Sequence, residues 1–339
     1  MIKNLNLSKI MAFFFIILIN YIFIFFSIYI VSAFLLINKI TPKIELIRDY
    51  QRNFYQFGGI REIWQSNDNC IEYDKELIYV PKKSSCNFNN IEFETTLSFD
   101  NYGRYSDHPI NYNNNAVVVL GDSHAMGWGV NDQDTFSAIL EEKINRPVYN
   151  LAVAGYGTPR ELIRLEKSNL INEVETIIIQ YCYNDYGENK DFIINTNDQA
   201  KEKFDIVGKS KPMSFWKKLR KSFRYSLTIP IDIITNKNQL MDFNNHQNLF
   251  ESKLLESNVL KDKNIIIFYV NGYDMKFLNF PRGKSKKFNN LNYYDFDVWE
   301  KYTFQIDGHL NERGHNYIAE ELYKILKWYL IINFINKSF

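Results

Sequence analysis

The stretch AVVVLGDSHAMGW, residues 116–128, ends an apolar, β-branched run in a serine that lies between an acid and an imidazole. A serine hydroxyl can attack a carbonyl as a nucleophile when a nearby base removes its proton. Gly121 permits a tight exit from the predicted strand, and a helix that starts at the serine would present backbone N–H groups to a developing oxyanion. An ordinary turn is the alternative, because Asp and Ser are common turn residues. Ser123 is therefore a candidate nucleophile.

Three more residue groups follow segments that we predict to be strands or precede the last predicted helix. Gly155 lies where the backbone can approach a substrate closely, or where it merely turns. Asn184 follows the apolar run 176–181, so its amide either donates a hydrogen bond at the sheet edge or closes a turn. Asp307 and His309 suit a general base whose tautomer is fixed by the acid, with helix capping or a surface histidine as the alternative.

These residues lie in an alternation of strands and helices that begins at Ala116. Such alternation predicts a parallel sheet covered on both faces, with its ligands at the carboxyl ends of the strands. The expected strands are 116–120, 147–153, 176–182 and 264–270, and the expected helices are 134–144, 159–170 and 311–330. We expect residues of about 187–258 to form a polar insertion. Its basic and aromatic stretch 209–224 predicts either an amphipathic interfacial helix or a solvated helix packed by its aromatic face.

The N-terminal region has no charged residue between Lys9 and Lys39. That apolar length exceeds the roughly 20 residues that cross a bilayer as a helix. A cleaved signal peptide is the alternative, although its apolar region is usually only about 7 to 15 residues long. We therefore expect an N-terminal tail at 1–9, a transmembrane helix at 10–38 and a membrane-proximal lead-in at 39–115.

The cysteines bear on the orientation of this single-pass protein. Basic residues flank the apolar segment on both sides, so the positive-inside rule does not favour a translocated body. Cys70 and Cys86, sixteen residues apart, could close a disulfide in an oxidising compartment, which leaves Cys182 unpaired. We expect the body to be extracytoplasmic and Cys70 to be bonded to Cys86.

The composition excludes some classes of function. The formal net charge is +1, from 40 basic and 39 acidic side chains, so we expect no binding to nucleic acid. Five histidines and three cysteines are scattered without metal-ligand spacing, so we expect neither a metal nor a cofactor.

The four chemical segments, in this order, resemble those of the SGNH or GDSL hydrolase superfamily. The resemblance implies that Ser123 is the nucleophile, that His309 is the base with Asp307 beside it, and that Gly155 and Asn184 contribute to an oxyanion hole with the Ser123 N–H. Gly155 stands five residues after an Asn, as the family spacing requires. The implied fold is a three-layer α/β/α, flavodoxin-like SGNH domain with a central parallel sheet, over residues 116–335.

Two segments depart from the common family pattern. The acid and base stand as Asp307-Gly308-His309 instead of Asp-x-x-His, and Cys182 occupies a position that is usually Gly. The first block, Gly-Asp-Ser-His-Ala, and the following GWGVNDQDTF are similar to membrane-anchored members associated with surface polysaccharides.

The resemblance implies a serine esterase that acts on acyl, in particular acetyl, esters of a cell-surface glycan. An O-acetyltransferase of a surface polysaccharide is one alternative, because water and a sugar hydroxyl attack the same acyl-enzyme. A catalytically silent glycan-binding or assembly protein is the other.

Overall fold

The chain forms two compact units in a computed structural model that describes residues 7–104, 116–168, 170–194, 196–208, 214–230, 239–271, 275–277, 279–298 and 300–337. The first unit joins residues 1–61 to 212–236, and the second joins 62–211 to 237–339. The predicted boundary at 115/116 therefore falls inside the second unit. The reason is that three strands of the predicted lead-in belong to the same sheet as the strands after it.

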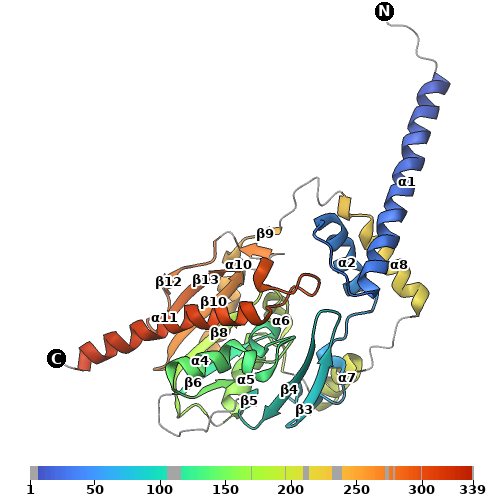
Figure 1. The fold of residues 1–339 in the computed structure, drawn as a ribbon. Coiled ribbons are helices and arrows are strands. Elements are labelled where there is room, and N and C mark those ends of the chain that lie inside the picture. The colour runs from blue at the N-terminus through green and yellow to red at the C-terminus, as the bar shows by residue number, and fades with distance from the viewer. Residues whose placement is uncertain are drawn as a thin grey trace, which may run out of the picture. The chain divides into compact units, whose positions relative to one another are not determined.

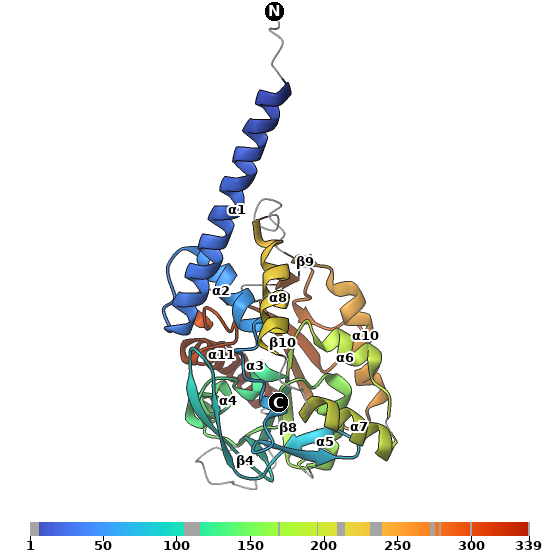
Figure 2. The same ribbon diagram turned by 90° about the vertical axis from the view of Figure 1, so that its right-hand side faces the viewer.

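Three helices with described bounds belong to the first unit and are labelled in Figure 2. They are α1 (Leu7–Ile37), α2 (Glu45–Phe57) and α8 (Phe215–Ser226). Helix α1 contains a 30-residue segment that is long and apolar enough to cross a membrane, and only 11% of its most apolar window is buried. A signal sequence passes the same test of length and composition, whereas a core helix would be mostly buried.

Helix α8 is the helix predicted within the basic stretch 209–224, of which residues 209–213 lie outside the described part. Its apolar residues Leu219 and Phe223 pack against a buried cluster that includes Phe25 and Tyr29 of α1. The ring centroids of Phe223 and Phe25 are 5.5 Å apart. Of the two readings of this stretch, the helix packed by its aromatic face matches these contacts.

The second unit is built on a large sheet (Figure 1). Among the described residues, nine strands form it in the order β12-β13-β10-β8-β6-β7-β5-β4-β3. Their bounds are Ser85–Asn89 (β3), Glu94–Asp100 (β4), Gly103–Arg104 (β5), Ala116–Gly121 (β6), Val148–Asn150 (β7), Val174–Tyr181 (β8), Asn264–Asn271 (β10), Gly283–Lys284 (β12) and Leu291–Asp297 (β13).

The five central strands are parallel and confirm the predicted flavodoxin-like order. Numbered along the chain from β6, they lie in the order 2-1-3-4-5. The chain leaves β6 toward β7 on one side and returns to β8 on the other. This reversal opens a crevice at the carboxyl ends of β6 and β8, where doubly wound sheets bind ligands.

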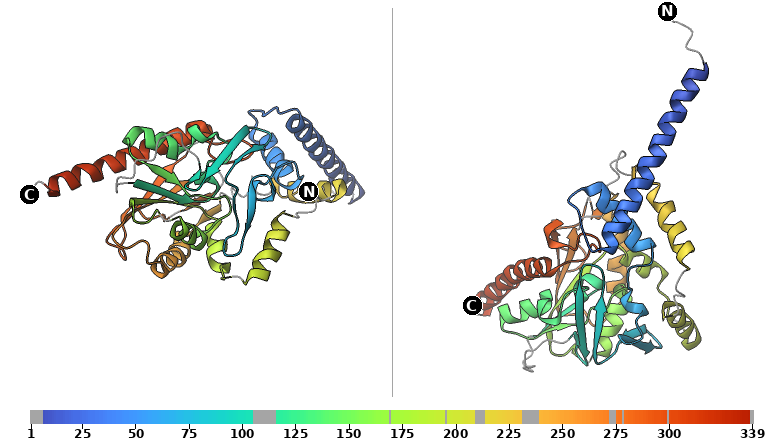
Figure 3. Two further views of the ribbon diagram at one scale, coloured as in Figure 1. Left: turned by 90° about the horizontal axis from the view of Figure 1, so that it is seen from below. Right: turned by 45° about the vertical axis from the view of Figure 1, so that its right-hand side comes forward.

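Helices cover both faces of this sheet, which confirms the three-layer fold (Figure 3). Successive strand residues point to opposite faces: Val117 and Val119 pack in the core with α4 and α11, whereas Val118 and Leu120 pack in the core with α5 and α10. The bounds are Phe136–Ile144 (α4), Thr158–Lys167 (α5), Phe243–Glu256 (α10) and Glu312–Lys337 (α11).

The expected insertion is more ordered than its polar composition suggests. It contains α6 (Asp185–Asp191), α7 (Asn197–Gly208), the short β9 (Gln239–Met241) and α10, besides α8 of the first unit. Phe243 and Phe250 of α10 are fully buried in the sheet core, so α10 is the crossover helix that leads to β10. Its apolar residues are widely spaced among Asn, Gln and Glu, which hid the helical pattern.

Short elements complete the second unit. The hairpin of β1 (Ile71–Asp74) and β2 (Ile78–Pro81) precedes the large sheet, and β11 (Met275–Phe277) pairs with β9. The 3₁₀ turns are η1 (Trp64–Ser66), η2 (Asp132–Asp134) and η3 (Glu300–Tyr302).

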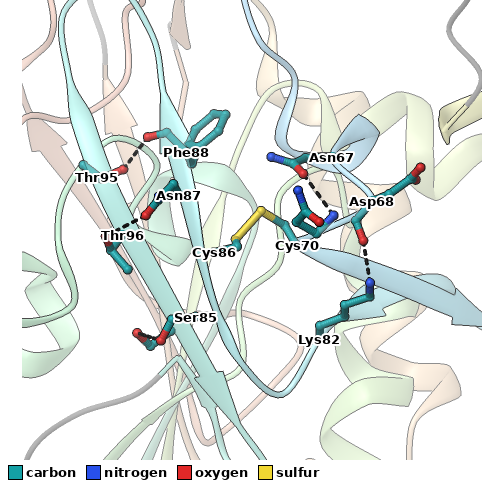
Figure 4. The surroundings of a disulfide bond; sticks show 12 residues. Asn67, Asp68, Cys70, Lys82, Ser85, Cys86, Asn87, Phe88, Thr95 and Thr96 are labelled. Atoms are coloured by element: carbon teal, nitrogen blue, oxygen red, sulfur yellow. Dashed lines mark hydrogen bonds between the residues drawn. A yellow bond between two sulfur atoms is a disulfide. The ribbon is translucent and has the colours of Figure 1, made fainter.

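The predicted disulfide is present. Cys70, just before β1, is bonded to Cys86 in β3, and both side chains are buried (Figure 4). The bond ties the β1–β2 hairpin to the antiparallel end of the large sheet. Cys182 is the remaining free cysteine, and it lies buried one residue after β8.

Candidate active site

Ser123 lies at the first position of α3 (Ser123–Met126), directly after β6. Gly121 makes the exit from the strand with φ 144°, and a Cβ there would lie 2.7 Å from the Cβ of Ala125. Asp122 caps the helix, because its Oδ1 accepts a hydrogen bond of 3.1 Å from the His124 N–H. The first helical N–H groups have no intrahelical acceptor, so the Ser123 N–H is available to a ligand.

Ser123, His309 and Asp307 form one hydrogen-bonded chain. The Nε2 atom of His309 lies 2.8 Å from Ser123 Oγ, and its Nδ1 atom is hydrogen-bonded to Asp307 Oδ1. The Asp307 carboxylate is fully buried. Because an ionised carboxylate only accepts, the proton resides on Nδ1 and the lone pair of Nε2 faces the hydroxyl.

Gly308 makes the shortened Asp-Gly-His spacing compatible with this contact. Its φ is 86°, a left-handed conformation that favours glycine, and its N–H donates to the Phe304 carbonyl at 3.0 Å. The Phe304 N–H donates to the His309 carbonyl at 2.8 Å. This tight loop turns the carboxylate of Asp307 back to the ring two residues later.

Glu92, in the connection between β3 and β4, binds the backbone of the loop that carries Asp307 and His309. Its carboxylate accepts from the backbone N–H groups of Gln305, Ile306 and Asp307, at 2.8, 2.9 and 2.7 Å. Burial raises the pKa of Glu92, and these three amides act in the opposite direction. No sequence pattern predicts this role of Glu92, because its partners are backbone groups more than two hundred residues away.

Two further rings fix the imidazole of His309. The Trp128 ring stacks on it with centroids 4.8 Å apart and planes at 14°, and the His124 ring lies 4.8 Å away at 35°. The loop that carries Trp128 is held by buried Arg104, which donates to the carbonyls of Met126, Gly127 and Val130 and pairs with Asp132 at 2.7 Å.

Gly155 follows β7, and Asn184 stands directly before α6. The Asn184 amide donates to Asp122 Oδ2 at 3.2 Å, so the carboxylate that caps α3 also orients this amide. Gly155 has φ 78°. Asn150, five residues earlier, donates to the Ala125 carbonyl at 2.9 Å and thereby ties β7 to α3.

The peptide between Ala154 and Gly155 is oriented by Tyr79 of β2. The buried Tyr79 hydroxyl donates to the Ala154 carbonyl at 2.8 Å. In a trans peptide the N–H points away from the C=O, so this bond directs the Gly155 N–H away from Tyr79. Arg160 donates to the next carbonyl, that of Gly155, and pairs with Glu188 at 2.5 Å. A Cβ on Gly155 would meet Tyr79 Oη at 2.8 Å and Gln65 Nε2 at 2.7 Å.

Three buried carboxyl groups lie beneath the crevice. Burial raises the pKa of Asp122, and it raises the pKa values of Glu161 and Asp185 well above their ordinary range. Repulsion from Asp122 adds to the rise of the latter two pKa values. Neither oxygen of Glu161 has a hydrogen-bond partner among the described residues, so its neutral acid form is favoured.

Within the described ranges, no group of three His, Cys, Asp or Glu side chains is arranged to hold a metal ion.

A family model shows to which family the chain belongs. The model for GDSL-like lipase/acylhydrolase matches residues 117–322, which is more than half of the chain. The chain belongs to this family. It is therefore an esterase, and its GDSL domain begins at β6 and ends within α11. Tyr79 and Glu92 both precede the matched segment.

Solved structures of esterases also align with this GDSL chain. The psychrotrophic esterase EstA from Pseudoalteromonas sp. is 14% identical, with 63% of this chain and 98% of that chain covered and a TM-score of 0.33. An acetyl xylan esterase, Est2A, from the rumen bacterium Butyrivibrio proteoclasticus is 11% identical, with 67% and 66% covered and a TM-score of 0.32. No curated protein matches the chain.

Proposed function

We propose that Ser123 is the nucleophile of a serine esterase that releases acyl groups from esters of a cell-surface glycan. The observation that carries this proposal is the hydrogen-bonded chain from Ser123 Oγ through His309 to the buried Asp307. Such a chain activates a hydroxyl near neutral pH, because the imidazole takes the proton and the carboxylate stabilises the resulting imidazolium.

In the first step the Ser123 Oγ forms a bond to the ester carbonyl carbon while its proton passes to His309 Nε2. The tetrahedral intermediate collapses when the C–O bond to the alcohol breaks, and His309 returns the proton to that leaving oxygen. Water, deprotonated by the same nitrogen, then attacks the acyl-enzyme, so that the acid is released and the hydroxyl of Ser123 is restored.

The oxyanion of each intermediate would be bound by the N–H groups of Ser123 and Gly155 and by the Asn184 amide. Loss of one such donor typically costs a factor of about 10² to 10³ in kcat. The bonds from Tyr79 to the Ala154 carbonyl and from Asn184 to Asp122 support this assignment, because they orient two of the three donors before substrate binds.

We also propose that α1 crosses the membrane and that the second unit is extracytoplasmic. Helix α1 has 31 residues, about 46 Å, which exceeds the ~30 Å apolar core of a bilayer. Its buried residues Phe25 and Tyr29 lie toward the C-terminal part, where α2 and α8 pack, and the preceding residues are exposed. The Cys70–Cys86 bond supports an oxidising compartment.

The glycan part of the proposal rests on the resemblance of the Gly-Asp-Ser-His-Ala block to polysaccharide-associated members. The same acyl-enzyme would serve an O-acetyltransferase if a sugar hydroxyl replaced water. A catalytically silent glycan-binding protein is the remaining alternative.

The test is mass spectrometry of the full chain in nanodiscs after incubation with an activated acetyl ester, with and without a polysaccharide acceptor. We expect acetate to be released at the same rate in both samples. Label that moves to the sugar would favour the transferase. Release that is equal in the wild-type chain and in Ser123→Ala would overturn the assignment.

A further inference from the structure

A groove with a volume of ≈ 820 Å³ opens beside the proposed oxyanion donors. Gly155 and Asn184 belong to its lining, and the other lining residues come from the η1 and β2 region and from α5, α6 and α7 with the residues that flank them. Pockets of 300 to 1,000 Å³ typically hold whole small-molecule ligands, so an acetyl group fills only a small part of this space.

The groove is walled largely by aliphatic and aromatic side chains. Among its lining residues are Ile63, Ile78, Phe192, Ile193, Ile206 and Val207. Ile193 is 55% exposed and Ile206 is 66% exposed. Large apolar side chains that stay open to water in a groove lined also by Gly155 and Asn184 indicate a surface that is covered by an apolar ligand.

The walls are fixed in place without a ligand. The Ser66 hydroxyl donates to the Val207 carbonyl at 2.9 Å, and the Tyr73 hydroxyl donates to the Asn197 carbonyl at 3.0 Å. Both bonds fasten α7 to the segment that carries the disulfide. The groove is therefore preformed, and a ligand does not have to order it.

The charged lining residues do not form an anion site. Arg160 is buried and already paired with Glu188 at 2.5 Å, and it donates to the Gly155 carbonyl. Asp191 and Lys203, of opposite sign, complete the charged residues in the lining. The isoleucine, valine and phenylalanine side chains of the lining offer a sugar chain no hydrogen-bond partner, so this part of the groove favours an apolar ligand.

We propose that this groove binds the apolar chain of the acyl group, so that the preferred ester carries an acyl group longer than acetyl. The inference rests on the proposed function, because the carbonyl oxygen must face Gly155 and Asn184. Because these two residues also line the groove, a chain that continues from that carbonyl can extend into it. This inference revises the acetyl expectation while the reaction at Ser123 stays the same.

The test is a series of p-nitrophenyl esters from acetate to octanoate, hydrolysed by the full chain in nanodiscs. Each buried methylene is worth about a fourfold gain in kcat/KM, and about twofold if it is half covered. We expect kcat/KM to rise by at least tenfold between acetate and octanoate. Acetate turnover with a falling series would overturn the groove assignment and leave the esterase proposal intact.

Two matched variants separate the groove from unspecific partition into the lipid. Ile206→Asn changes a lining residue, and Ile194→Asn changes a neighbouring isoleucine that is 84% exposed and is not in the lining. We expect the octanoate-to-acetate ratio of kcat/KM to fall several-fold in Ile206→Asn and to stay unchanged in Ile194→Asn. Equal ratios in both variants would contradict the proposal.

A binding measurement covers the case in which no ester is turned over. Octanoate should bind the Ser123→Ala chain by calorimetry, with weaker binding in the double variant that adds Ile206→Asn. Octanoate binding without ester turnover would contradict the proposed function and support the groove assignment. Absence of binding together with acetate turnover would reject the groove alone.

Discussion

Replacement of Tyr79 by Phe tests whether residues before the GDSL domain position the catalytic groups. The change removes one hydroxyl and leaves the ring, so it creates no large cavity. It leaves the Ala154 carbonyl without the 2.8 Å bond that fixes the peptide of Gly155. Because Tyr79 acts through Gly155, we call it a positioning residue.

Two limits set the expected loss of kcat in Tyr79→Phe. A buried carbonyl that loses its donor costs about 1–3 kcal/mol of folding stability. Complete loss of an oxyanion donor costs about 2.7–4 kcal/mol in the activation free energy, and a donor that is only misdirected loses a fraction of that. We therefore expect kcat to fall about tenfold, or roughly 1.4 kcal/mol, with little change in KM.

The assay is steady-state turnover of p-nitrophenyl butyrate together with thermal unfolding. The matched control is Tyr293→Phe, because Tyr293 is also buried and its hydroxyl donates to Glu251 Oε1 at 2.7 Å on a strand outside the crevice. Both variants should lose similar stability, and only Tyr79→Phe should lose kcat. An equal loss of kcat in both would refute the reasoning, because it would mean that lost stability, and not the Gly155 peptide, lowers turnover.

Three more predictions address the acids. Asp307→Asn should lower kcat by up to about 10⁴-fold with little change in melting temperature, because the wrong tautomer of His309 results; near-normal turnover would indicate a Ser-His dyad. Glu92→Gln should lower both melting temperature and kcat, because at least one of three amides then faces an NH₂ group; unchanged values would show that Glu92 does not hold the loop. The pKa of Glu161 is higher in the folded chain than in the unfolded chain. Glu161 therefore contributes its full stability to the fold below about pH 4.5, and this contribution is lost as the pH rises. Glu161→Gln should therefore flatten the fall of melting temperature between pH 5 and 8, and parallel curves would contradict this.

Much of the site could be predicted from the sequence because it lies at strand ends. The apolar runs before Ser123 and Asn184 identify two adjacent parallel strands, and parallel strands bring their carboxyl ends to one edge. The alternation also predicted the three layers. The pairing of Cys70 with Cys86 followed from their spacing.

The parts that could not be predicted depend on contacts without a sequence pattern. Strand β13 was missed, although LNYYDFD has strand-like aromatics, because polar residues interrupt its apolar run. Strands β3–β5 join the sheet through antiparallel backbone pairing with β7, in which Arg104 lies opposite Asn150. Tyr79 and Glu92 bond to backbone groups, which leave no trace in residue types.

The reactivity of Ser123 is the most direct test of the account. The full chain in nanodiscs is treated with a fluorophosphonate, and the adduct is measured by intact mass and located by peptide mapping. We predict one adduct, on Ser123, which is absent in Ser123→Ala and forms much more slowly in His309→Gln. An unlabelled wild-type chain, or an adduct that persists in Ser123→Ala, would contradict the assignment of Ser123 as the activated nucleophile.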